Sequence, residues 1–138
     1  MAYDNDNIFA KILRGEAPCV KVFEDDFSLA FMDVMPQVDG HTLVIPKDPT
    51  QDILGADPQI LGHTIQTVQR VAGAVKAAFA APGVMLAQLN GAAAGQTVFH
   101  LHFHIMPRHE GLEFRMHARD MADMGVLAEH AERIQNHL

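Results

Sequence analysis

The densest group of reactive side chains in this sequence is His100, His102 and His104, three imidazoles at every second position of one segment. The residues between and after them are all apolar: Leu101, Phe103 and Ile105. An alternation with a period of two predicts a β-strand whose imidazoles share one face while the apolar side chains enter the core. An exposed edge strand could alternate in the same way, but Thr, Lys or Ser would suit a solvent-facing surface better than histidine.

A shared metal ion is the first function to test for this row. Same-face residues of a strand lie about 6.6 Å apart, so the outer pair is separated by about 13 Å, whereas zinc needs nitrogen ligands at about 2.1 Å. Two of the histidines could still bind an ion together with His41 or His109. A hard cation fits poorly, because residues 84–109 contain no Asp or Glu to supply oxygen ligands.

Phosphoryl chemistry suits the row better. A neutral imidazole is a nucleophile near pH 7, because its ordinary pKa of about 6.5 leaves one ring nitrogen unprotonated. The flanking rings can donate hydrogen bonds to phosphoryl oxygens. Directly upstream, residues 91–95 form a loop of small residues whose backbone N–H groups could approach an anion, and Gln96 and Thr97 add side-chain donors.

The apolar pattern of the remaining chain predicts the elements that must position this row. It indicates a helix over 7–14, strands over 20–22, 29–34 and 41–45, a helix over 58–81, strands over 84–89 and 98–106, and a helix over 124–138. Asp57 before Pro58 is a favourable start for the long helix, whose apolar stripe is too short for a coiled coil and should pack against a sheet. Strands that occur in runs favour an α+β fold, an antiparallel sheet with helices on one side.

Length and composition limit the class of protein. The 138 residues have room for one ordinary domain, and 49% apolar content suits a packed core. The formal net charge of -7 argues against sequence-independent binding of nucleic acid, which needs many Lys and Arg side chains. The single cysteine, Cys19, excludes an internal disulfide and a zinc finger. Neither an export signal nor a membrane-spanning segment is visible, so we expect a cytoplasmic protein.

Residues 90–108, NGAAAGQTVFHLHFHIMPR, resemble the signature of the histidine triad (HIT) family of nucleotide hydrolases and transferases. Shorter stretches resemble the amino-terminal half of the family: 8–12, 23–33 and 40–47. The likeness thus covers a core of residues 8–108 and leaves 109–138 as a C-terminal extension. It implies an antiparallel sheet of about five strands with a short N-terminal helix, a long central helix and a C-terminal helix. It also implies a homodimer, paired through the long helix and a strand.

The same resemblance implies roles for the reactive residues. His102 would be the nucleophile that attacks the α-phosphorus and transiently carries the nucleotide. His100 and His104 would orient it and bind phosphate oxygens. Gln96 and Thr97 match positions beside the phosphate and leaving group, where Thr97 could donate a hydrogen bond to a departing amine.

The resemblance also implies a substrate-binding set. Asp33 and His41 match the ribose region, with Asp33 suited to accept from the sugar hydroxyls. The base pocket would be walled by apolar residues, for which ordinary core packing is an equally good interpretation: Ile8, Phe9, Ile12, Phe31 and Val34. Asn90 and Gly95 complete the set. Leu89 occupies a position that often makes a polar phosphate contact in the family, and whether Asn90 replaces that contact stays open.

One departure from the family bears on metals. Many members have a C-x-x-C near the start and a His after the Pro-Lys, which complete a structural zinc site. This chain has Asn7 and Ala10 at the first two positions and Asp48 at the third. We therefore predict no zinc, and the chemistry inferred above requires no other metal or cofactor.

Together, these features predict a hydrolase that cleaves the P–N bond of nucleoside 5′-phosphoramidates and releases a nucleoside monophosphate. Purine nucleotides are the expected substrates by resemblance. A dinucleoside polyphosphate hydrolase is an alternative, because it uses the same attack and expels a phosphate. A catalytically weak nucleotide-binding regulator is another, suggested by Leu89, and a metal-binding module is a third. We expect no nucleic-acid or membrane partner.

Overall fold

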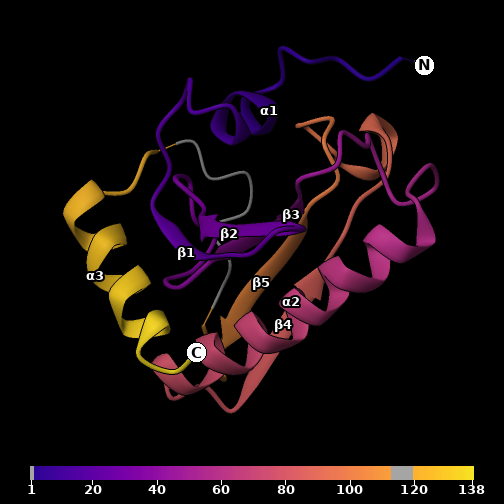
Figure 1. Ribbon diagram of the computed structural model, residues 1–138. Coiled ribbons are helices and arrows are strands. Elements are labelled where there is room, and N and C mark those ends of the chain that lie inside the picture. The colour runs from indigo at the N-terminus through magenta and orange to yellow at the C-terminus, as the bar shows by residue number, and fades with distance from the viewer. Residues whose placement is uncertain (1, 113–119) are drawn as a thin grey trace.

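The computed structural model describes residues 2–112 and 120–138 of the chain (Figure 1). The elements, in chain order, are α1 (Ile8–Leu13), β1 (Lys21–Glu24), β2 (Ser28–Met32), β3 (Thr42–Pro46), α2 (Pro58–Ala78), β4 (Gly83–Ala87), the short 3₁₀ helix η1 (Ala92–Ala94), β5 (Phe103–Arg108) and α3 (Met124–Gln135). The predicted α+β architecture and the order of helices and strands are confirmed.

The five strands form one antiparallel sheet in the order β1-β2-β3-β5-β4. The last strand in the chain therefore enters the sheet between β3 and β4, and Leu43 of β3 lies opposite His104 of β5. Just before β3, the carbonyl of His41 accepts a hydrogen bond from Asp33 N at 3.0 Å. The topology thus brings three polar positions, far apart in the sequence, to one end of neighbouring strands.

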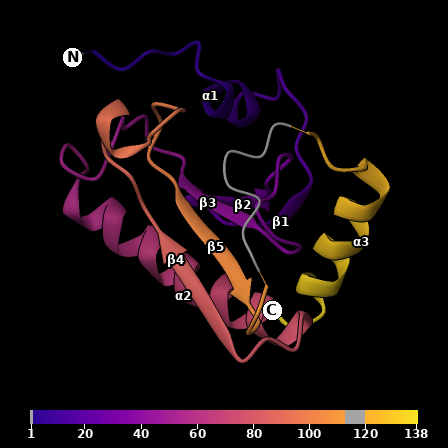
Figure 2. The ribbon, with the colours of Figure 1, turned by 180° about the vertical axis from the view of Figure 1, so that it is seen from behind.

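Helices cover both faces of the sheet, whereas the sequence pattern predicted helices on one side only. α2 and α3 pack on one face, and α1 lies on the opposite face (Figures 1 and 2). The reason is that β2 and β3 have apolar side chains on both faces and are buried throughout. The side chains on the α1 face are Leu29, Phe31, Leu43 and Ile45. Those packed toward α2 and α3 include Ala30, Met32 and Val44.

Helix α2 begins as predicted. Asp57 caps it by accepting a hydrogen bond from Gln59 N at 2.8 Å, and Pro58 occupies the first helical position. The helix ends at Ala78, three residues before the predicted end at residue 81. Within the described parts of the chain, none of the helices combines the length and apolarity required to cross a membrane.

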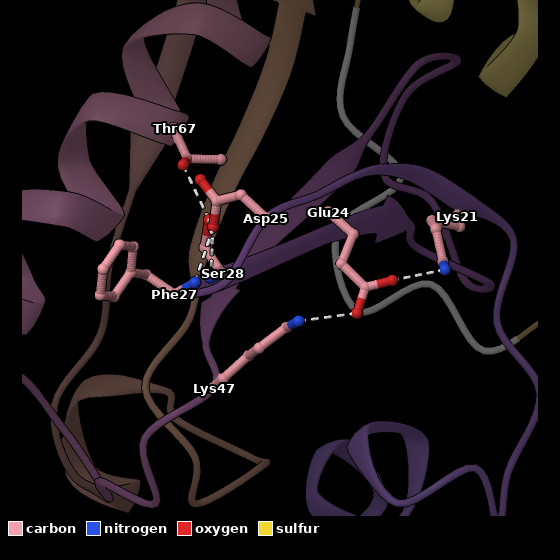
Figure 3. Close-up of polar contacts among 7 residues, drawn as sticks. All are labelled: Lys21, Glu24, Asp25, Phe27, Ser28, Lys47 and Thr67. Carbon is pink, nitrogen blue, oxygen red and sulfur yellow. Dashed lines mark hydrogen bonds and ion pairs between the residues drawn. The ribbon is translucent and has the colours of Figure 1, made fainter.

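The ends of β1, β2 and β3 are tied by the polar contacts in Figure 3. Glu24 bridges Lys21 at 2.5 Å and Lys47 at 2.8 Å, and these two ammonium groups lower the pKa of Glu24 to about 2. Asp25 accepts from Ser28 N at 2.8 Å, and Ser28 Oγ lies 2.7 Å from Thr67 Oγ1 on α2. These contacts join β1 to the residue that follows β3, and they join the start of β2 to the long helix α2.

Strand β5 begins at Phe103, not at residue 98 as the alternation predicted, and it continues past residue 106 to Arg108. The preceding segment leaves the ladder because it bonds to the loop after β3, with Leu101 N donating to Thr50 O at 2.8 Å. Pro107 is tolerated inside the strand because β3 pairs only with residues 103–105, so β4 alone lies opposite Pro107. The alternation of side chains nevertheless persists through the irregular segment: the core contains Leu101, Phe103 and Ile105.

Candidate active site

His102 lies at the centre of the row with a defined proton position. Its Nδ1 is 2.7 Å from the carbonyl oxygen of His100. A carbonyl only accepts, so Nδ1 carries the proton and the lone pair of the neutral ring is on Nε2. The ring of Phe9 packs edge-on against His102 at 5.0 Å, and the ring of His104 does so at 4.9 Å on another side. His102 is 7% exposed, and Nε2 makes no hydrogen bond within the described residues.

His104 is oriented by His41, which lies behind it. His41 accepts from Gln37 N at Nδ1 with a distance of 3.1 Å, so its Nε2 carries the proton. That proton points to His104 Nδ1 at 2.9 Å and to a carboxylate oxygen of Asp33 at 3.5 Å. His104 accepts at Nδ1, so in its neutral form it carries its own proton on Nε2, where it can serve as a donor. His41 is fully buried, and its ring supports His104 rather than facing a ligand.

Ligand atoms of Asp33, His41 and His104 all lie within 4.8 Å of one another, close enough to consider a metal ion. The proton positions argue against this use. A metal ligated by His41 Nε2 needs the lone pair of that nitrogen, but the backbone N–H of Gln37 already occupies the lone pair on Nδ1. A neutral imidazole has only one lone pair in its plane, so the cluster fits a hydrogen-bonded relay better than a metal centre.

His100 occupies a different position from its two neighbours. Its Nε2 lies 2.8 Å from the Pro46 carbonyl, and its Nδ1 contacts the hydroxyl of Tyr3. The side chain has no exposed surface. Because both nitrogens are engaged by the protein, His100 supports the row and offers no donor to a phosphate in this structure. The row therefore consists of one buried support, His100, and two adjacent rings, His102 and His104. Orientation of His102 by His100 is consistent with this arrangement, whereas a phosphate contact from His100 stays a prediction.

Burial dominates the electrostatics of the row. It lowers the pKa of His100 and of His104 to about 4, because charging a buried imidazole sacrifices its hydration, and it lowers the pKa of His102 in the same way. Burial also raises the pKa of Asp33 to about 6, although a hydrogen bond from Met35 N partly opposes the shift. The site therefore holds neutral imidazoles near pH 7, the protonation state that a nitrogen nucleophile requires.

We expect the free energy of unfolding to fall as the pH is lowered from 7 to 4. Folded His100 and His104 resist protonation until about pH 4, whereas the unfolded chain binds these protons near pH 6.5. Each unit of difference between the folded and unfolded pKa lowers the free energy of unfolding by about 1.4 kcal/mol once the unfolded chain is protonated. Asp33 opposes the trend, because its raised pKa lets the folded state bind a proton first. Urea unfolding across this range measures the slope. His104→Gln should flatten it, and an unchanged slope in that variant would contradict the assignment.

The loop before the row is held by Gln96. This side chain is 3% exposed, and its amide accepts from Gly91 N at 2.7 Å and donates to the carbonyls of Gln51 at 2.8 Å and Val98 at 3.0 Å. These contacts tie the loop to itself and to the segment after β3. Gln96 is thus placed to shape the loop, and its contact with a phosphate stays a prediction. Thr97 is exposed, so its hydroxyl is accessible to a ligand.

The backbone of this loop is less available to an anion than the sequence suggested. The N–H groups of residues 91, 94, 95 and 96 are all donated within the loop. Gly95 has a positive φ of 102°, and a Cβ there would lie 3.3 Å from Leu89 Cδ1, so the turn requires glycine. Asn90 pairs with Gln88 through both amides and accepts from Ile53 N at 2.9 Å. Asn90 therefore joins two loops, and its replacement of the phosphate contact missing at Leu89 stays a prediction.

The residues predicted to wall a base pocket belong to different packing groups, and the pocket itself stays a prediction. Phe9 and Phe31 meet edge to face at 5.4 Å, and Ile12 joins their cluster under α1. Val34 instead packs with the core on the other face. Ile8 lines a cavity of about 520 Å³ between the amino-terminal segment and the loop before the row, together with Ala2, Asp4, Asn7, Gln51, Thr97, Val98 and Phe99. Ile8 and Thr97 are the only residues of the predicted site among those that line this cavity.

The sequence from just after the first helix to just beyond β5 also matches a known family. The model of the HIT domain matches residues 14–111, which is most of the chain. The chain belongs to the HIT family. Proteins of this family are generally nucleotide hydrolases or transferases, and the histidine row is the part of the fold that gives the family its name.

Relatives of this HIT protein occur in distant organisms. An adenylylsulfatase of Arabidopsis thaliana is 41% identical over 106 residues, which are 77% of this chain and 54% of that protein, so the chain spans about half the length of that relative. A HIT-like protein of Bartonella henselae, described as involved in cell-cycle regulation, superposes over the whole of both chains with a TM-score of 0.96 at 51% identity. A protein of Sulfolobus tokodaii, described as a hypothetical histidine triad nucleotide-binding protein, superposes with a TM-score of 0.85 at 32% identity, over 93% and 89% of the two chains.

Two contributors to the site of this HIT protein were missed in the sequence. Tyr3 contacts His100 although the two residues are 97 positions apart in the sequence, and the Pro46 carbonyl contacts His100 from 54 positions away. Tyr3 is the only tyrosine of the chain, which was the one available signal for it. A backbone carbonyl has no sequence signal at all.

Proposed function

We propose that this protein hydrolyses nucleoside 5′-phosphoramidates through a nucleotidyl intermediate on His102. The observation that carries the proposal is the hydrogen bond from His102 Nδ1 to the His100 carbonyl, which places the lone pair on Nε2. The lowered pKa of His102 keeps that lone pair unprotonated near neutral pH. Family membership supports the nucleotide, and purine preference stays an expectation from the resemblance.

The steps follow from the proton positions. His102 Nε2 forms a bond to the α-phosphorus while the P–N bond to the amine breaks, and the departing nitrogen takes a proton from solvent by way of the Thr97 hydroxyl. His104 Nε2–H can donate to a phosphoryl oxygen, because His41 occupies the other nitrogen of that ring. Thr97 can donate to the departing amine. Water then attacks the phosphorus and gives up a proton to solvent, the bond to His102 breaks, and the nucleoside monophosphate is released with a neutral His102 ring.

Rapid quenching with adenosine 5′-phosphoramidate tests the intermediate. Mass spectrometry of the digested protein should find adenosine monophosphate on the peptide that contains His102. Full turnover without any adduct on this peptide would contradict the covalent step. Tight binding of adenosine monophosphate with no turnover of any nucleotide would instead indicate a regulator with weak chemistry, the alternative suggested by Leu89.

Cleavage of an acid anhydride is the second candidate, favoured by the 41% identity to an adenylylsulfatase. Sulfate, or the phosphate of a dinucleoside polyphosphate, leaves as a stable anion and gains less than an amine from a proton donor. Rates on adenosine 5′-phosphoramidate, adenosine 5′-phosphosulfate and a diadenosine polyphosphate should therefore respond differently to Thr97→Val. A loss confined to the amidate supports the phosphoramidase, whereas faster turnover of the wild-type protein on either anhydride supports the second candidate.

A homodimer is proposed from the resemblance and from the outer edge of the sheet. β4 ends the sheet on one side and has no neighbouring strand beyond it in the described chain (Figure 2). Met85 and Leu86 on this strand are 38% and 48% exposed, an unusual apolar content for an unprotected edge. Light scattering of the wild-type protein should give the mass of two chains, and light scattering of Leu86→Lys should give the mass of one chain. A wild-type mass of one chain would contradict the dimer.

A cytoplasmic location also stays an expectation.

A further inference from the structure

The amino-terminal strap, residues 2–7, reaches the histidine row through Tyr3. The hydroxyl of Tyr3 is hydrogen bonded to His100 Nδ1, and the two rings meet edge to face with centroids 5.6 Å apart and an interplanar angle of 72°. Asn7 Nδ2 donates to the same phenol oxygen at 2.9 Å, while Asn7 Oδ1 caps α1 by accepting from Ala10 N at 2.9 Å. One contact therefore joins the strap, the first helix and the row.

The direction of each hydrogen bond in this series follows from the groups at the two ends of the series, the Asn7 amide and the Pro46 carbonyl. The Pro46 carbonyl can only accept, so the proton of neutral His100 is on Nε2 and its Nδ1 is bare. The side chain of His100 is fully buried, and its lowered pKa keeps the ring neutral near pH 7. Tyr3 must therefore donate its phenol proton to Nδ1. The hydrogen bonds run in one direction, from Asn7 to Tyr3, His100 and Pro46.

His100 transmits this constraint to His102 through its backbone. The ring of His100 is held at both nitrogens, so the residue has one orientation, and its carbonyl stays directed at His102 Nδ1 at 2.7 Å. That hydrogen bond determines which nitrogen of His102 bears the lone pair. An imidazole that is free to rotate or to exchange tautomers would present the attacking nitrogen for only part of the time.

We propose that Tyr3 is a positioning residue for the His102 nucleophile and acts through His100. Its effect on rate rests on the proposed function, but the hydrogen bond itself is a property of the free protein. Loss of the Tyr3 hydroxyl leaves a buried ring nitrogen without a donor, and such a group finds another partner by rotating or by changing tautomer. Rotation of the ring moves the residue whose carbonyl orients His102, and a change of tautomer removes the hydrogen bond that holds the ring to the Pro46 carbonyl.

The competing explanation is that Tyr3 only anchors the strap. An anchor that is lost lowers the thermal stability and leaves the chemical step of the folded protein unchanged. A positioning residue that is lost lowers kcat more than it changes KM, because the nucleophile is misplaced in the transition state while binding of the nucleotide depends on other groups. The two explanations also differ in the tautomer of His100, which an anchor does not alter.

Tyr3→Phe removes the hydroxyl and keeps the ring. We expect kcat for adenosine 5′-phosphoramidate to fall about tenfold, equivalent to about 1.4 kcal/mol, with KM changed by less than about twofold. Formation of the adduct in the rapid quench should slow by the same factor. Asp6→Ala is the matched control, because Asp6 is exposed in the same strap and its side chain makes no hydrogen bond within the described residues. This control should retain wild-type kcat.

The tautomer can be measured without any substrate. In protein labelled with ¹⁵N at histidine, the His100 nitrogens should show a protonated Nε2 and a hydrogen-bonded, unprotonated Nδ1. In Tyr3→Phe the Nδ1–H form of His100 should become detectable. Tyr3 is the only tyrosine in the chain, so 3-fluorotyrosine labels this position alone. The ¹⁹F chemical shift should change in His100→Gln and stay the same in Asp6→Ala. The fluorinated protein retains the phenol hydroxyl, so its kcat should stay near the wild-type value, whereas kcat of Tyr3→Phe should fall.

The outcomes separate this inference from the proposed function. Absence of the adduct in the wild-type protein contradicts the proposed function, while the ¹⁵N spectra of the free protein still test the Tyr3 contact. The positioning role is wrong if Tyr3→Phe keeps wild-type kcat, whether or not its melting temperature falls. It is equally wrong if the His100 nitrogens resonate alike in the wild type and in Tyr3→Phe.

Discussion

Replacement of His102 by glutamine is expected to lower kcat for adenosine 5′-phosphoramidate by about 10⁴-fold or more, the loss typical of an enzyme without its nucleophile. Glutamine is the sharper substitution, because its amide can still donate to the His100 carbonyl and fill most of the space beside Phe9. The variant should therefore fold and bind nucleotide but form no adduct. Steady-state rates, nucleotide affinity and the rapid quench measure these three properties separately.

His137→Gln is the matched control for this experiment. His137 is exposed at the end of the chain, and its backbone N–H bonds to Ile134 within the last turn. The control should keep the wild-type rate, since this ring lies outside the row. If His102→Gln turned over the amidate at the wild-type rate, His102 would not be the nucleophile and the covalent mechanism would be wrong.

Gly40→Ala is expected to destabilise the fold by about 2–4 kcal/mol and to lower the melting temperature by about 10 °C. Gly40 has a positive φ of 88°, and a Cβ there would lie 2.7 Å from Cε2 of Phe79, the residue that caps the end of α2. The backbone strain and the ring contact therefore add. Because Gly40 directly precedes His41, the displaced backbone should also loosen the support of His104. Urea or thermal unfolding measures the stability.

Two glycines separate the contributions to this effect. Gly15 has a φ of 77°, but a Cβ added there would meet no other atom within 4 Å, so Gly15→Ala reports the backbone strain alone. Gly62 lies inside α2 with open space around it, so Gly62→Ala should stabilise by about 0.5–1 kcal/mol through helix propensity. Gly40→Ala in a Phe79→Leu background should recover part of the loss. If Gly40→Ala were no worse than Gly15→Ala, close packing against Phe79 would be excluded as a cause.

The histidine segment illustrates how far a local pattern leads. Alternation correctly placed Leu101, Phe103 and Ile105 in one core, because the backbone stays extended and successive side chains point to opposite sides. It did not reveal that the ladder starts only at Phe103. Strand pairing needs a partner, and the residues before Phe103 find theirs in the loop at Thr50, which no local pattern encodes.

The position of the first helix shows the same limit. The apolar spacing of residues 8–13 correctly predicted a helix, and Asn7 caps its start. Which face of the sheet it covers depends on β2 and β3, whose side chains are apolar on both sides. A strand buried on both faces has no polar face to identify the solvent side, so the sequence pattern alone could not assign helices to the two faces.

By itself, the sequence determined the elements, their order and the set of histidines, because helix starts, turns and alternation depend on residues that are close along the chain. The tertiary structure decided which nitrogen carries the proton in His100 and His104. Their partners lie far away in the sequence: His41 is 63 positions from His104, and Pro46 and Tyr3 are 54 and 97 positions from His100. The partner of His102 is only two positions away, at the His100 carbonyl, but the distant contacts of His100 hold that carbonyl in place. Desolvation, which lowers the pKa values of the row, likewise arises only when distant segments close over the rings.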